Sequence, residues 1–289
     1  ALKWLRGVPF VYGVHDIWPE SAVVNGMLKD NWLVSILRKL ERFVYARAGA
    51  VGVVSSGFID DIASKGVSRS KIHLLPDWAD NSVYYPTPYD TDLAKSKGMF
   101  GKFNIVFGGQ LGVAQGLQTV IEAAELLRSD EDIQIVFVGE GLEKAGLESD
   151  VNARGLTNVR FLGRVTPEQI RAIYGVADAL LVHLSPGFFA SLSVPGKTYA
   201  YLASGKPILM AMDGSAASLV EASGAGVVCH PGDAPSMADA VRKLKGMSAE
   251  QLAKMGASGR EAFITTYQKD IVVDVHEELL ATLAKHGDS

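Results

Sequence analysis

The segment from 195 to 209, PGKTYAYLASGKPIL, contains the residues whose types and spacing most clearly suggest chemistry. It predicts a helix that begins at Pro195 and Gly196, ends at Gly205 and gives way to a buried strand. Lys197 then falls in the first helical turn, where free backbone N–H groups and the helix dipole favour an anion. We therefore expect an anion site at this helix start, with a solvated surface lysine as the alternative.

A glycine-rich turn predicts a second part of such a site. Gly108 and Gly109 follow the strand-like stretch KFNIVF directly, and a helix is expected soon afterwards. A strand, a glycine turn and a helix in succession let backbone amides approach a phosphate closely. Many turns of this kind are glycine-rich for steric reasons alone, so the motif by itself leaves both interpretations open.

Strands and helices alternate along the chain, which is typical of parallel α/β sheets. In the first part we expect strands over 8–14, 50–54 and 71–75, and helices over 28–47 and 57–65. In the second part the expected strands lie near 103–108, 133–138, 158–162, 179–183, 207–212 and 226–229. The expected helices lie near 116–128, 142–154, 167–175, 196–203, 216–223, 234–245, 249–267 and 270–285.

This pattern predicts two Rossmann-like, doubly wound parallel-sheet domains, of which the first is incomplete. The expected limits are 1–85 for the N-terminal domain, 86–102 for a polar linker, 103–267 for the C-terminal domain and 268–289 for a closing helix.

Composition excludes several classes of protein. The chain has 289 residues, 48% hydrophobic and 21% charged, as is ordinary for a globular protein. A net charge of −4 gives no sign of nucleic-acid binding. The single cysteine, Cys229, rules out an internal disulfide, and we expect it to be a buried structural thiol. No apolar run is long enough to predict a transmembrane helix.

Four stretches resemble the donor-binding half of glycosyltransferase family 4: GGQLGVAQGLQTVIEAAELL, FVGEGLEKAGLE, VRFLGRVTPEQIRAIYGVADALLV and SVPGKTYAYLASGKPIL. Nearer the start, VHDIWPESAVV and LERFVYARAGAVGVVSSGF resemble the branch that makes bacterial surface polysaccharide, including fucosamine-transferase-like enzymes. The resemblance implies the GT-B fold, with the closing helix crossing back to the first domain. It also implies that the first part of the N-terminal domain is lacking, so we expect this chain to be a poor catalyst or inactive.

The same resemblance implies a donor site at the carboxyl ends of the second domain's strands, where open α/β sheets bind ligands. Lys197 would neutralise the charge that a nucleoside diphosphate gains as it leaves the sugar. The residues implied in donor binding are Gly108, Gly109, Gln110, Gln115, Glu140, Gly141, Arg164, Val165, Pro195, Gly196 and Lys197.

His15 and Asp16 are the candidate catalytic residues, because they follow the strand over 8–14. A histidine at a matching place in the family contacts the transferred sugar, and Asp16 would orient that sugar or the acceptor. The alternative is a helix-capping aspartate beside a solvent-facing histidine. The other histidines lack the spacing of a metal site. Among them only His183, at a strand end near the donor loop, is a candidate for the site.

The chain departs from the family pattern at several positions. Gln110 and Gln115 stand where many members carry Arg and Lys, and Leu192 and Ala200 stand where many carry a pair of glutamates. The second glutamate holds the ribose hydroxyls, so Ala200 puts the nucleotide affinity in doubt.

The segment 27–47 is amphipathic and locally basic. We interpret it either as a helix that packs on its own sheet or as a peripheral membrane contact that suits a lipid-linked acceptor.

Together these features predict a retaining glycosyltransferase that uses a nucleotide diphosphate sugar as co-substrate and needs no cofactor or metal. Its acceptor would be a lipid-linked glycan, and its location the cytoplasm, at the inner face of the plasma membrane. The alternatives are a nucleotide-sugar epimerase of GT-B fold, or a degenerate non-catalytic partner protein.

Overall fold

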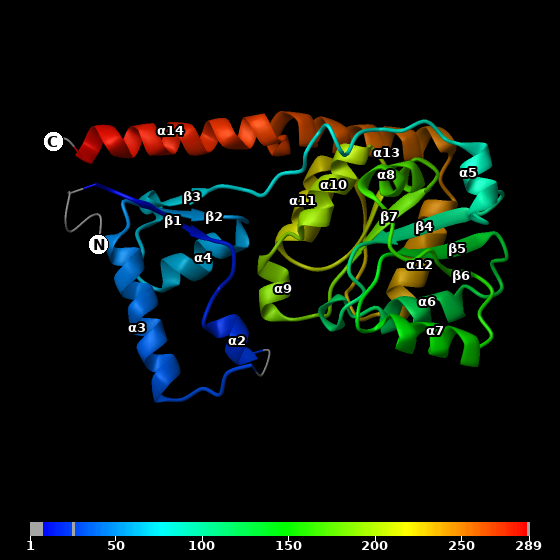
Figure 1. Ribbon diagram of the computed structural model, residues 1–289, viewed down its shortest axis with the longest axis horizontal. Helices are drawn as coiled ribbons and strands as arrows, with labels where there is room; N and C mark the ends of the chain where they lie inside the picture. Colours follow the sequence, from blue (N-terminus) through cyan, green and yellow to red (C-terminus); the bar gives the residue numbers. More distant parts are fainter. Residues whose placement is uncertain (1–7, 25–26, 288–289) are drawn as a thin grey trace. The chain divides into compact units, whose positions relative to one another are not determined.

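The computed structural model describes residues 8–24 and 27–287 and divides into two compact units (Figure 1). Unit 1 comprises Ala1–Asp77, Leu192–Val194 and Asp270–Ser289. Unit 2 comprises Trp78–Ser191 and Pro195–Lys269.

Unit 1 contains a three-stranded parallel sheet in the order β1-β2-β3. Its strands are β1 (Val11–Val14), β2 (Ala50–Val53) and β3 (Ile72–Leu74). All four residues of β2 are buried, as expected for the central strand of a parallel sheet. The helical elements are α2 (Glu20–Val24), α3 (Trp32–Arg47), α4 (Gly57–Ser64), the 3₁₀ turn η1 (Arg69–Lys71) and, apart from its first residue, α14 (Lys269–Gly287).

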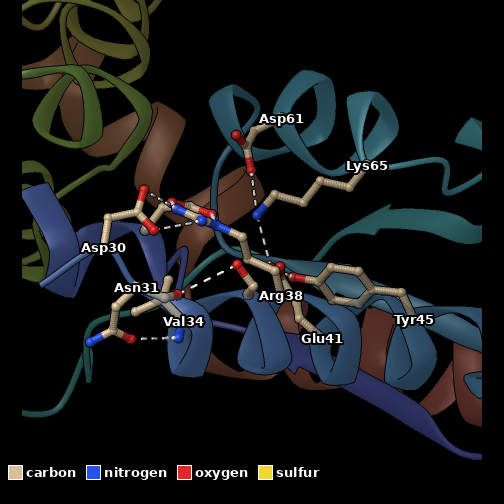
Figure 2. A network of polar contacts seen from close by, with 10 residues as sticks. Asp30, Asn31, Val34, Arg38, Glu41, Tyr45, Asp61 and Lys65 are labelled. Atoms are coloured by element: carbon tan, nitrogen blue, oxygen red, sulfur yellow. Dashed lines mark hydrogen bonds and ion pairs between the residues drawn. The ribbon is translucent and has the colours of Figure 1, made fainter. Parts of the chain in front are cut away.

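A network of charged side chains ties the helices of unit 1 together (Figure 2). The ammonium of Lys65, which caps the end of α4, lies 2.8 Å from a carboxylate oxygen of Glu41 and 3.1 Å from one of Asp61. These three side chains are only 9–15% exposed. Glu41 also accepts a hydrogen bond from the Tyr45 hydroxyl, whose pKa burial raises. Lys65 therefore joins α3 to α4 through charge pairs that are largely withdrawn from water.

Unit 2 contains a six-stranded parallel sheet in the order β6-β5-β4-β7-β8-β9. This is the doubly wound order, in which successive strands are added on one side of β4 up to β6 and then on its other side from β7 onward. The strands are β4 (Phe103–Gly108), β5 (Ile133–Val138), β6 (Val159–Phe161), β7 (Ala179–His183), β8 (Ile208–Ala211) and β9 (Gly226–Val228). The register pairs Phe103 with Ile133 and Gly108 with Val138, so β4 and β5 end at the same level.

Helices cover both faces of the unit 2 sheet (Figure 1). On one face lie α6 (Gln118–Leu126), α7 (Lys144–Ala153) and α12 (Ala234–Lys245), whose buried side chains form one core with the strands. On the other lie α8 (Pro167–Gly175), α10 (Gly196–Ser204), α11 (Ser215–Ser223) and α13 (Ala249–Ala262). Smaller elements are α5 (Thr91–Ser96), α9 (Phe188–Leu192), the 3₁₀ turn η2 (Val113–Gln115) and the π-helical turn η3 (Phe263–Tyr267).

The structure corrects the interpretation of 86–102 as a linker. This stretch contains α5, whose first amides are capped by the Asp90 carboxylate, and it groups with unit 2. Ala94 and Met99 are fully buried. The polar composition therefore reflects the outer face of a short packed helix, not an unstructured connection.

The other differences concern short or terminal segments. The first strand begins at Val11, not at residue 8, and α3 begins at Trp32, where the Asn31 side chain caps it. α2 and α9, of five residues each, were not predicted, because so short a helix shows no complete apolar period. The long helix expected over 249–267 ends at Ala262 and continues as a π-turn.

Candidate functional site

Unit 2 contains a cavity of about 900 Å³ at the carboxyl ends of β4 and β5, bordered by α8 and α10. Of the eleven residues predicted for a donor site, nine line it: Gly108, Gly109, Gln110, Glu140, Gly141, Arg164, Val165, Gly196 and Lys197. Ala200, which the family resemblance aligned with a ribose-binding glutamate, also lines it; the remaining lining residues were not predicted: Trp78, Ala79, Asp80, Tyr84, Val138, Gly139, Pro167, Ile170 and Tyr174.

Two glycine turns form one wall of this cavity by packing backbone against backbone. Gly139 has φ +147°, and a Cβ on it would overlap the carbonyl oxygen of Gly109. A Cβ on Gly108 would likewise overlap the Tyr174 hydroxyl. The glycines are therefore required by close packing, which is the steric alternative that the sequence left open.

Three backbone amides of the first turn are already used by the protein. The Gly108 amide donates to the Tyr201 hydroxyl, the Gly109 amide to the Val138 carbonyl and the Leu111 amide to the Glu140 carbonyl, each at 2.9 Å. Gly108 and Gly109 both line the cavity, and their amides are bonded within the protein; that they face a diphosphate stays a prediction.

Two cations line the cavity, the exposed Arg164 and the partly buried Lys197. α10 begins at Gly196, and Pro195 is its N-cap with an extended ψ of 137°, not its first helical residue as expected. The Lys197 ammonium donates to the Gln115 side-chain oxygen at 2.9 Å and lies 3.7 Å from the centre of the Phe107 ring. Among the described residues no carboxylate lies within 4.0 Å of it. Burial lowers the pKa of Lys197 to about 7.

A partly buried ammonium with only a neutral oxygen and an aromatic face as partners is suited to an anionic ligand. Gln115 does not line the cavity itself but holds this ammonium. The predicted anion site is therefore carried mainly by a side-chain cation.

Glu140 and Ala200 also line the cavity. Glu140 pairs with Lys144 at 2.7 Å, and this hydrogen bond lowers the pKa of the carboxyl. Ala200 lines the cavity with a methyl group, so no carboxylate projects from that turn of α10.

His15 and Asp16 belong to unit 1, at the carboxyl end of β1. The His15 ring nitrogen Nδ1 lies 3.7 Å from a carboxylate oxygen of Asp77, which follows β3. Asp77 was not predicted, because its pairing with His15 depends on two strand ends that are far apart in the sequence. Both partners are well exposed, with 72% and 43% of their side-chain surfaces accessible.

A second cavity of unit 2, of about 700 Å³, borders the amino ends of β7 and β8. The two cations that line it are hydrogen-bonded to backbone carbonyls at or just beyond the ends of helices. Lys206 donates to the carbonyls of Gly175 and Ala177, and Arg260 donates to that of Ala203. Both cations are therefore bonded to backbone carbonyls, whereas the one hydrogen-bond acceptor of Lys197 in the described part of the chain is a side-chain oxygen.

Comparisons with known proteins identify the fold and the relatives. The sequence model described as glycosyl transferases group 1 matches residues 102–246, and a glycosyl transferase 4-like domain matches residues 1–78. WbjE of Pseudomonas aeruginosa, which carries a glycosyltransferase name, is 26% identical over 94% of this chain and 68% of its own length. The O-antigen chain mannosyltransferase C of Escherichia coli is 24% identical over 95% of this chain and 73% of its own.

Solved structures agree on the architecture. HepE of Anabaena, in complex with UDP and glucose, superposes with a TM-score of 0.76 at 19% identity, over 97% of this chain and 73% of that one. WaaG, a glycosyltransferase involved in lipopolysaccharide biosynthesis, gives a TM-score of 0.65 at 16% identity, over 93% of this chain and 74% of that one.

Proposed function

Because this chain belongs to the glycosyl transferases group 1 family and has the GT-B fold, we propose that it transfers a sugar from a nucleotide diphosphate sugar to a glycan acceptor. The relatives named for O-antigen and colanic acid synthesis support an acceptor in bacterial surface polysaccharide. The retaining stereochemistry is proposed on the family resemblance alone.

The observation that carries this proposal is the Lys197 ammonium, which has no carboxylate partner among the described residues and lines a cavity at the carboxyl ends of β4 and β5. Breaking the bond between sugar and diphosphate leaves negative charge on the diphosphate, and a cation placed there stabilises that charge. The UDP in the HepE structure supports uridine diphosphate as the leaving group, with guanosine diphosphate as the second base to test. On the family resemblance, we assign His15 to contacting a hydroxyl of the transferred sugar and Asp16 to orienting the sugar or the acceptor.

Calorimetric titration with UDP and GDP tests the proposal directly. We expect a dissociation constant of millimolar or better for one of them, and weaker binding of the corresponding monophosphate. If neither diphosphate gives heat or shifts the melting temperature, the donor site is wrongly assigned.

We further propose that the acceptor is lipid-linked and that the protein works at the inner, cytoplasmic face of the plasma membrane. The support is the outer face of α3, where Leu33, Ile36, Leu40 and Phe43 are each about half exposed and recur at helical spacing. Val34 and Tyr45, which are buried, pack the opposite face of the same helix into unit 1. The described residues include no helix that is long and apolar enough to cross a membrane.

An apolar stripe beside Lys39, Arg42 and Arg47 is typical of helices that lie in a membrane interface. Co-sedimentation should therefore be stronger with vesicles that contain anionic lipid than with neutral vesicles, and Ile36→Ser together with Leu40→Ser should reduce it. Equal sedimentation of the wild type and this double variant would contradict the membrane contact.

Ala200→Glu is expected to strengthen UDP binding, because Ala200 lines the cavity and a carboxylate there can accept hydrogen bonds from the ribose hydroxyls. A hydrogen bond to a charged acceptor is worth about 1.5–3 kcal/mol, so a gain of roughly tenfold is expected after the cost of burying the group. Calorimetry measures it, with Ala200→Gln as the uncharged control. Weaker binding by a folded Ala200→Glu would mean that another group already holds the ribose.

A further inference from the structure

His183, the last residue of β7, is fully buried and makes one specific polar contact. Its Nδ1 lies 2.6 Å from the backbone carbonyl oxygen of Gln115. Because a carbonyl oxygen only accepts, Nδ1 carries the hydrogen. The other ring nitrogen, Nε2, is buried and has no hydrogen-bond partner among the described residues. Burial lowers the pKa of His183, and the nearby Lys197 charge lowers it further against the opposing effect of the Gln115 carbonyl. The imidazole is therefore held neutral in one tautomer.

This contact is one of three that fix the 3₁₀ turn η2 to the end of β7. The Val113 carbonyl accepts from the Ser185 hydroxyl at 3.4 Å, and the Ala114 carbonyl accepts from the Ser185 amide at 2.9 Å. Because His183 Nδ1 donates to the Gln115 carbonyl, each of the three carbonyls of the turn accepts a hydrogen bond from a residue at the end of β7 or just after it. Gly116 then turns left-handed at φ +60°, where a Cβ would lie 3.1 Å from His183 Cε1.

The turn η2 also positions the Lys197 ammonium in the cavity. The Gln115 side-chain oxygen accepts the hydrogen bond from the Lys197 ammonium at 2.9 Å. His183, Gln115 and Lys197 thus form a continuous series of contacts that leads from the end of β7 to the cavity, although they come from three separate segments.

We propose that His183 is a positioning residue of the donor site, whose Nδ1–H holds Gln115 so that Gln115 places the Lys197 ammonium for the diphosphate. This inference rests on the proposed function and deepens it. A histidine that merely filled the core would be replaceable by any side chain of similar volume. A positioning histidine requires a donor at the place of Nδ1.

Two substitutions separate these roles. Asparagine can present an N–H where His183 presents Nδ1–H, whereas leucine fills the volume without a donor. We expect His183→Leu to weaken UDP binding about 3- to 10-fold, the effect of losing one hydrogen bond, and His183→Asn to restore it to within about twofold. Ser185→Ala removes only the longest contact to the turn and is the matched control, with UDP affinity close to that of the wild type.

A double-mutant cycle tests the route through Gln115. In a Gln115→Ala background, His183→Leu should cause no further loss of UDP affinity, because the link to Lys197 is already broken. Equal loss in both backgrounds, or equal affinity of His183→Leu and His183→Asn, would overturn the inference. If His183→Leu does not fold, Gln115→Leu alone must weaken UDP binding 3- to 10-fold. Unchanged affinity of Gln115→Leu would refute the positioning of Lys197 by Gln115.

A measurement without nucleotide keeps this test separate from the proposed function. The ¹³Cε resonance of Lys197, assigned by comparison with Lys197→Met, should shift in His183→Leu and return toward its wild-type position in His183→Asn. If the wild type binds neither UDP nor GDP, the proposed function fails while this shift still tests the positioning. An unmoved resonance in His183→Leu would refute the positioning by itself.

Discussion

Lys197→Met is expected to weaken UDP binding by roughly 10- to 150-fold, which corresponds to about 1.5–3 kcal/mol for a hydrogen bond to a charged group. Lys197 is the partly buried cation of the cavity, and its present partners are the neutral Gln115 oxygen and the Phe107 ring. The amides of Gly108, Gly109 and Leu111 cannot replace it, because they are bonded within the protein. Calorimetric titration with UDP near pH 6.5, where the ammonium is mostly protonated, measures the loss.

The control is Lys254→Met, which removes an exposed lysine of α13 that does not line the cavity. It should leave the dissociation constant for UDP unchanged. A folded Lys197→Met that binds UDP as tightly as the wild type would remove the central residue from the proposed site.

The affinity for UDP should also fall as the pH rises above neutrality. In the free protein, burial holds the pKa of Lys197 near 7, whereas a bound diphosphate favours the charged form and raises that pKa. At a pH between these two pKa values, the protein takes up a proton when UDP binds. The dissociation constant therefore increases with pH, by up to about tenfold per unit, until the pKa of the complex is passed.

Titrations between pH 7 and 9.5 avoid protonation of the terminal phosphate, whose pKa is about 6. The slope should be present in the wild type and absent in Lys197→Met. A flat profile for the wild type would mean that Lys197 does not change its protonation when UDP binds.

Lys65→Met should lower the free energy of unfolding by about 3–5 kcal/mol, the usual cost of removing one partner from a buried charge pair. Lys65 lies between the carboxylates of Glu41 and Asp61, and none of the three side chains is more than 15% exposed. Without the ammonium, two partly buried negative charges of α3 and α4 face each other. Urea denaturation followed by circular dichroism measures the change.

The matched control is Arg69→Met, because Arg69 pairs with Asp60 where both side chains are at least 67% exposed. An exposed pair contributes only about 0–1 kcal/mol, so this variant should be nearly neutral. Adding Glu41→Gln and Asp61→Asn to Lys65→Met should recover much of the lost stability. If Lys65→Met and Arg69→Met destabilise equally, burial does not strengthen the Lys65 network.

The sequence by itself determined the α/β class and most elements of unit 2. β4, β5 and β7 have the predicted bounds, as do α8 and α12, because each combines a clear apolar pattern with marked ends. α8 has a Thr166 capping box with proline in its first turn, and α12 begins after the Asp233 cap. The segments that line the cavity were likewise predictable, since parallel strands end together at one edge of the sheet.

What the tertiary structure alone decided is which polar groups in those segments are free. Gly108 and Tyr201 are 93 residues apart, Lys197 and Gln115 82 apart, and His183 and Gln115 68 apart. No local pattern shows that the Gly108 amide is occupied, that Lys197 has no carboxylate beside it, or that His183 is held neutral. Hydrogen bonding and burial depend on which groups packing brings together, and here packing occupies the Gly108 and Gly109 amides and leaves Lys197 without a carboxylate partner among the described residues.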